Sequence, residues 1–132
     1  MKRKIILSAT TLLLSFIGYS QECGKFKNGT FKFTDPKSKE VCIITRKDNI
    51  QTERMEKSDE TYDFEIVWID DCTYTVTPTP ATAQRKPDVT KPGVMTVKIT
   101  KTKKDSYTQK VTIATDPKFS RVDEVFVAEE KK

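Results

Sequence analysis

Alternation of apolar and polar residues, which is typical of β-strands with one buried face, recurs along most of the chain. The strongest example is the segment 61–70, in which Asp63 and Glu65 occupy polar positions. The apolar face of this segment carries, at a spacing of two residues, Tyr62, Phe64, Ile66 and Trp68. A slip of one residue in the register of this strand would expose the whole aromatic set to water, so its pairing is strongly specified.

The same pattern, in weaker form, predicts about eight short strands in all. The other strand segments are residues 30–34, 41–46, 50–55, 73–77, 95–100, 107–113 and 122–127. Phe31 and Phe33 share one face of the first of these segments. The segment 50–55 alternates poorly, which indicates an edge strand, and we place its Glu53, like Asp63, on the water-facing side. Among the inward positions of the segment 107–113, Gln109 is a polar exception.

Most of these strands are joined by short turn signals, which favours an antiparallel up-and-down meander. A meander of about eight strands removes its edges by closing into a small barrel, which we favour over a two-sheet β-sandwich. The exception is residues 78–93, which contain four of the six prolines and predict a long loop of polyproline character with no strand. The predicted fold class is therefore all-β, with one domain over residues 21–132.

Residues 1–20 have the layout of a secretory signal peptide. A basic start at Lys2, Arg3 and Lys4 is followed by an apolar stretch that is short for a membrane span and by small residues before Gln21. A lipoprotein is the alternative because Cys23 follows closely, but small apolar residues do not precede that cysteine. We expect cleavage, export to the periplasm or the extracellular space, and no stable membrane anchor.

Cleavage changes the charge balance of the protein. The whole chain has 24 basic and 19 acidic residues, and the signal peptide removes three basic residues and no acidic ones, which leaves a net charge of +2. The remaining charges of both signs are interleaved along the chain. A nucleic-acid-binding domain usually concentrates its basic residues on one face. The sequence therefore predicts no nucleic-acid partner.

Three cysteines allow at most one internal disulfide and leave one thiol. Cys42 lies in the apolar run V-C-I-I and is expected to be a small buried residue. Cys23 and Cys72 flank predicted strands, which favours a bridge between them, although the other pairings stay open at this point. A disulfide fits the oxidising envelope compartment.

No residue pattern predicts an enzyme, a cofactor or a metal centre. The chain has no histidine to act as a base near neutral pH, no phosphate-binding loop and no Cys-x-x-Cys spacing. Asp70 and Asp71 are adjacent acids in a turn, where such residues are mostly solvated. We therefore expect a protein without catalytic, cofactor-binding or metal-binding residues.

Three segments resemble a group of uncharacterised small secreted proteins of flavobacterial type. The segments are CGKFKNGTFKF from Cys23, FEIVWIDDCTY from Phe64, and VKI from Val97 followed by DSY from Asp105. The resemblance implies a lipocalin-type small β-barrel and supports the Cys23–Cys72 pairing. The name DNA topoisomerase IV is often attached to such proteins, but topoisomerase subunits are several-fold longer, cytoplasmic, and need an ATP-binding domain or a DNA gate.

These observations predict a non-catalytic binding module, for which a small apolar ligand inside the barrel is the leading hypothesis. The aromatic residues expected to line such an interior site are Phe31, Phe33, Tyr62, Phe64, Trp68 and Tyr74. The alternative is a structural or protein-interaction module of the envelope that acts through its surface or through residues 78–93. We expect a monomer in either case.

Overall fold

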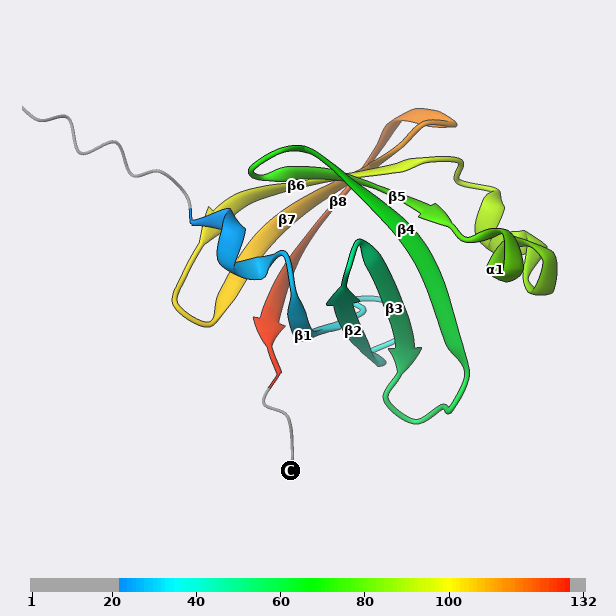
Figure 1. Ribbon diagram of the computed structural model, residues 1–132, viewed down its shortest axis with the longest axis horizontal. Coiled ribbons are helices and arrows are strands. Elements are labelled where there is room, and N and C mark those ends of the chain that lie inside the picture. Colours follow the sequence, from blue (N-terminus) through cyan, green and yellow to red (C-terminus); the bar gives the residue numbers. More distant parts are fainter. Residues whose placement is uncertain (1–21, 129–132) are drawn as a thin grey trace, which may run out of the picture.

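The computed structural model describes residues 22–128, in which eight antiparallel strands form a closed barrel (Figure 1). The strands are β1 (Gly29–Thr34), β2 (Val41–Lys47), β3 (Ile50–Met55), β4 (Thr61–Asp70), β5 (Thr73–Pro78), β6 (Met95–Thr102), β7 (Ser106–Ile113) and β8 (Asp116–Val127). Each strand pairs with its neighbour in the chain, and β1 pairs with β8 to close the barrel. The predicted all-β barrel is confirmed, and the sandwich is excluded. The predicted signal peptide, residues 1–20, lies outside the described residues.

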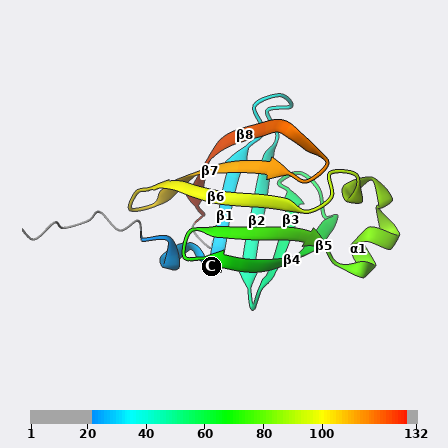
Figure 2. The same cartoon turned by 90° about the horizontal axis from the view of Figure 1, so that it is seen from above.

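The two ends of the barrel differ in what covers them. One end carries the short connections 48–49, 71–72 and 103–105 and the 3₁₀ turn η1 (Cys23–Phe26), and we call it the plugged end. The other end carries the remaining connections, among them residues 79–94 with their helix α1 (Pro80–Arg85), and we call it the loop end. Figures 1 and 2 show η1 and α1 at opposite ends of the barrel.

The turn η1 closes the plugged end by burying Phe26, whose ring centroid lies 4.8 Å from that of Tyr107. A disulfide between Cys23 and Cys72 ties η1 to the connection between β4 and β5, with a Cα–Cα distance of 5.2 Å. The favoured cysteine pairing is thus confirmed. The bridge joins residues 49 positions apart, a separation for which the chain-entropy model gives about 4 kcal/mol of stabilisation.

The predicted polyproline loop, residues 78–93, is wrong in two respects: Pro78 ends strand β5, and most of residues 80–90 are helical. They contain α1 and a second 3₁₀ turn, η2 (Pro87–Thr90). The side chain of Thr79 accepts a hydrogen bond from the backbone N–H of Thr82 (3.3 Å), and Pro80 occupies the first turn, where its missing N–H costs nothing. The buried Thr82 hydroxyl then accepts a hydrogen bond from the backbone N–H of Asp63 on β4 (3.1 Å), which docks α1 on the barrel.

Two other expectations from the sequence are wrong. The segment 50–55 is an internal strand, not an edge strand, because it pairs with β2 on one side and with β4 on the other. Its inward positions are polar, which accounts for the weak alternation. The last strand begins at Asp116 rather than at Val122, since residues 116–121 continue the pairing with β7 beyond the tight turn at 114–115.

We predict that the Cys42 thiol does not react with a thiol reagent while the protein is folded. Cys42 is buried and unbridged, and burial raises the pKa of its thiol to about 12, so the reactive thiolate is scarce near neutral pH. Unfolding without reductant should release one reactive thiol per chain, measured by mass after labelling. Two or more labels, or rapid labelling of the folded protein, would contradict the described pairing.

Candidate functional site

The guanidinium group of Arg46 lies inside the barrel, and the residue as a whole is 2% exposed. It projects from β2 near the plugged end, where its Nη1 donates to the backbone carbonyl of Phe26 (3.0 Å) and its Nε to the side-chain oxygen of Gln51 (2.8 Å). Its Nη2 donates to the hydroxyls of Tyr74 (2.7 Å) and Tyr107 (2.6 Å). A buried charge is tolerated when its hydrogen bonds are made, and this arrangement makes four of them.

The negative charge nearest to this group in the hydrogen-bond network belongs to Glu53. Gln51 connects the two, since its amide oxygen accepts from Arg46 and its amide nitrogen donates to Glu53 Oε1 (2.9 Å). Burial raises the pKa of the Glu53 carboxyl, although the Gln51 hydrogen bond and the positive charges of Arg46 and Arg121 oppose this shift. Burial also raises the pKa values of Tyr74 and Tyr107, so both hydroxyls stay neutral and Glu53 is the compensating anion.

A second cluster of polar side chains comes from β7 and β8, on the loop-end side of Arg46. The carboxylate of Asp123 accepts hydrogen bonds at Oδ2 from Arg121 Nε (2.9 Å) and from Gln109 Nε2 (3.3 Å). Gln109 is 4% exposed. Its side-chain oxygen, Oε1, is buried and has no hydrogen-bond partner in the described structure. A buried acceptor without a donor lowers the stability of the folded protein by about 1–3 kcal/mol.

These polar groups border a recess of about 40 Å³ in the barrel interior. One water molecule needs roughly 10–15 Å³ on this scale, so the recess has room for a group of a few heavy atoms. The lining consists of Phe33, Ile44, Gln51, Glu53, Tyr74, Val76, Met95, Val97, Gln109, Val111 and Arg121. The recess thus combines apolar walls with a small number of convergent polar groups, which is the usual composition of a small-molecule site.

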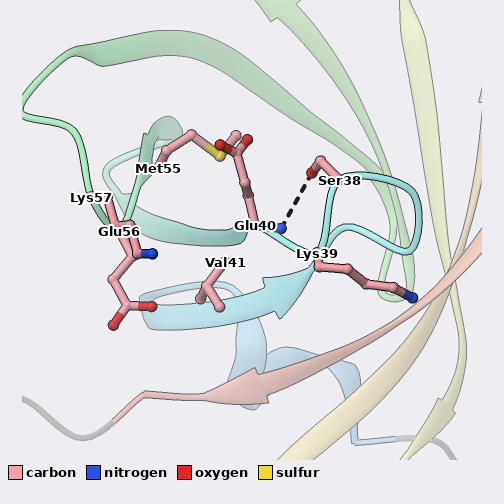
Figure 3. A pocket seen from close by; sticks show the side chains of 7 residues that line it. All are labelled: Ser38, Lys39, Glu40, Val41, Met55, Glu56 and Lys57. Carbon is pink, nitrogen blue, oxygen red and sulfur yellow. Dashed lines mark hydrogen bonds between the residues drawn. The ribbon is translucent and has the colours of Figure 1, made fainter.

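A separate groove of about 490 Å³ lies on the rim of the loop end, beside the connections 35–40 and 56–60. Its lining residues are Ser38, Lys39, Glu40, Val41, Met55, Glu56 and Lys57. Figure 3 shows the side chains of Glu40 and Met55 next to each other and that of Lys39 directed away. The Ser38 hydroxyl accepts a hydrogen bond from the backbone N–H of Glu40 (3.2 Å), so the groove wall is held by local turn contacts.

Of the six aromatic residues expected to line an interior ligand site, two line the recess and four do not. Phe33 and Tyr74 line the recess. The other four pack in or against the two apolar clusters of the barrel: Phe31, Tyr62, Phe64 and Trp68. Trp68 packs against Tyr74, with ring centroids 4.6 Å apart, so it contacts a residue of the recess lining without lining the recess itself.

Of the polar side chains that line the recess, only Gln109 was predicted from the sequence to point inward. Gln109 was visible because it interrupts an apolar face. Glu53 was placed on the water-facing side, and this is wrong: it pairs with Ile44 and Tyr62, and all three lie on the inner face. Arg46 and Arg121 also lie on the inner face, and the sequence analysis assigned no role to either. For Arg46, its spacing of two from Cys42 and Ile44 was the available signal.

Comparison of the chain with protein-family models, with curated proteins and with solved structures finds no match. Within residues 22–128, no helix has the length and apolar character needed to cross a membrane. The described part of the chain also contains no group of three or more cysteine and carboxylate side chains placed to hold a metal ion.

Replacement of Arg46 by Met should lower the free energy of unfolding by about 3–5 kcal/mol, because it removes four buried hydrogen bonds and leaves the partly buried Glu53 carboxylate without its compensating charge. Chemical denaturation followed by Trp68 fluorescence measures the loss. The matched control is Lys47→Met at the exposed neighbouring position, where we expect a change within about 0.5 kcal/mol. A loss below about 1 kcal/mol for Arg46→Met would show that the cluster adds little to stability.

Replacement of Glu53 by Gln should change how stability depends on pH. The folded-state pKa of Glu53 is raised above its ordinary value of 4.5, so folding disfavours ionisation. Relative to Glu53→Gln, the wild-type protein should therefore lose stability as the pH rises from 4.5 through the raised pKa, and one full unit between the folded and unfolded pKa values would correspond to about 1.4 kcal/mol. Denaturation curves across this range test it, with Glu65→Gln on the outer face of β4 as the control. Parallel profiles for Glu53→Gln and wild type would contradict the shift.

Proposed function

We propose that this chain is a secreted, non-catalytic module that binds a small molecule, with an apolar body, in the recess on the loop-end side of Arg46. The observation that carries the proposal is the buried Gln109 Oε1, which has no partner in the described structure and belongs to a side chain that lines the recess. Roughly 90% or more of the buried polar groups in proteins have a hydrogen-bond partner, so a buried oxygen without one needs an explanation. A ligand group that donates a hydrogen bond to this oxygen would remove the cost.

The location follows from two separate features. The predicted signal peptide directs the chain to the periplasm or the extracellular space, and the Cys23–Cys72 disulfide suits an oxidising compartment. The recess itself takes a terminal group of the ligand, because its volume is about 40 Å³. The remainder of the ligand would extend toward the loop end, where Met95 and Phe33 are only half-buried.

A second candidate function is a protein-interaction module of the envelope. The observation in its favour is a pair of apolar side chains on β4, Val67 and Ile69, which are 61% and 63% exposed. Residues 78–93 add exposed positions on α1 and η2. Exposed apolar side chains in single pairs are common on protein surfaces, so this observation is weaker than a buried unpartnered oxygen.

Native mass spectrometry of the secreted protein, purified from the organism that makes it, tests the first proposal. We expect a mass above that of the disulfide-bonded chain, lost on denaturation. Met95→Trp, at the loop-end side of the recess, should abolish the excess, whereas Met55→Trp, in the rim groove, should retain it. A bare mass for the wild-type protein would contradict the proposal, and an excess lost through Met55→Trp alone would move the site to the rim groove.

A further inference from the structure

The pleat of the barrel sorts charges that are interleaved along the chain. Strands β5, β6 and β7 lie side by side (Figure 2), and their buried residues alternate with outward ones. Over residues 73–77, 96–101 and 108–112, every outward position is threonine or lysine. We call these outward residues the threonine–lysine face. One row across the three strands consists of Thr75, Thr96 and Thr112.

The lysines of this face lie close together. Lys98 on β6 is directly opposite Lys110 on β7 in the register. Lys101 is opposite Thr108, which is the neighbouring outward position on β7. All three lysines are exposed, and none of them forms an ion pair within residues 22–128. Like charges directly opposite each other on paired strands are destabilising, so the lysine pair lowers the stability of the barrel.

Two common roles of surface lysines do not account for this pair. Lysines often protect the edge strands of a sheet, but β6 and β7 are internal strands of a closed barrel. Lysines also balance nearby acids. The acid in the same row is Asp70, beyond Thr73, and its pKa is lowered chiefly by the backbone N–H of Cys72 and least by Lys98. The preference of threonine for strands accounts for the hydroxyls of the face and not for its lysines.

Acidic residues begin only at the borders of the face. Glu65 on β4 is opposite Thr77, and Glu124 on β8 is opposite Thr108. Glu124 is already engaged, because it accepts a hydrogen bond from Lys103 Nζ (3.2 Å). Between these borders, three ammonium groups project among hydroxyls, and none of the described residues adds a carboxylate there. The face therefore complements a partner that is rich in both anionic groups and hydroxyls.

The composition of the face discriminates among the partners that a secreted protein meets. Lysine is depleted at the centres of protein–protein interfaces. A peripheral protein that binds a membrane inserts large apolar side chains between the lipids, and this face carries none. An acidic polysaccharide requires neither an apolar anchor nor a cavity, since its anionic groups pair with ammonium groups and its hydroxyls exchange hydrogen bonds with threonine. It is the partner that the face fits best.

We propose that the threonine–lysine face binds an acidic polysaccharide, whose carboxylate or sulfate groups contact Lys98, Lys101 and Lys110 and whose hydroxyls contact the neighbouring threonines. The inference goes beyond the proposed recess function and does not depend on it, because the two sites use opposite faces of the same strands. Salt screens contacts of this kind, with a Debye length of about 10 Å at 0.1 M ionic strength, so binding should weaken as the salt concentration rises.

The test titrates hexagalacturonate and sulfated maltohexaose into the ¹⁵N-labelled, disulfide-bonded secreted protein, with the methyl ester of the first and unmodified maltohexaose as neutral controls. We expect the charged forms alone to bind, with the largest amide shifts at Lys98 and Lys110. The double variant Lys98→Gln, Lys110→Gln should weaken binding about tenfold. The matched control, Lys37→Gln with Lys57→Gln, removes the same charge at exposed positions of the loop end and should change the affinity by less than about twofold.

The proposal is overturned if neither charged oligosaccharide binds, or if a neutral form binds as tightly as its charged form. It is also overturned if the control variant weakens binding as much as the lysine variant, because net charge alone would then explain the effect. Binding of phosphatidylglycerol vesicles without binding of either oligosaccharide would assign the face to a lipid surface instead. Unfolding is separated by the midpoint of thermal unfolding, which should stay unchanged or rise when the repelling pair is removed. A bare chain in native mass spectrometry would overturn the recess function and leave this proposal standing.

Discussion

The buried guanidinium of Arg46 is the constraint on which the interior of this barrel depends. A charged group that is 2% exposed must find all its partners inside the protein. Here they come from η1, β3, β5 and β7, so the one side chain ties the plug to three strands of the wall. The guanidinium carbon also lies 4.8–5.6 Å from the ring centroids of Phe31, Tyr74 and Tyr107, which adds cation–π attraction. The register of β2 against β3 is therefore specified by polar as well as apolar contacts.

The charge of Arg46 also accounts for the polar character of the space beyond it. Its compensation passes through Gln51 to Glu53, which places a carboxylate in the middle of the barrel instead of an apolar side chain. On the other side of the recess, Gln109 and Asp123 form a similar amide–carboxylate pair with Arg121. An interior built only for stability would have filled this space with apolar side chains. The polar lining and the unsatisfied oxygen are the features on which the proposed binding function rests.

The sequence predicts a strand correctly where the inner face of that strand is apolar. Strand β4 was evident because its aromatic residues alternate, and the turn at Asp48 and Asn49 was evident from its residue types, which adopt the positive φ values (51° and 63°) of a two-residue hairpin. Helix α1 was missed because four prolines in residues 78–93 were taken as breakers, although Pro80 follows the capping Thr79 and begins the helix. Glu53 was misplaced because polarity was taken as exposure, and only the register of a closed barrel shows which face is inner. The hydrogen bonds of Arg46 join residues up to 61 positions apart, which no local pattern reveals.

The measurement that tests the central role of Arg46 most directly is the rate at which its side-chain Nε–H exchanges with water, read from the ¹⁵N spectrum of the arginine side chains. That proton lies inside the barrel and is donated to Gln51 (2.8 Å). Arg85, on the exposed surface of α1, supplies the reference within the same sample. The account predicts that the Arg46 signal persists at a pH at which the Arg85 signal has been lost to exchange. Exchange of the Arg46 proton as fast as that of Arg85 would show that the guanidinium is hydrated, and the polar interior described here would be contradicted.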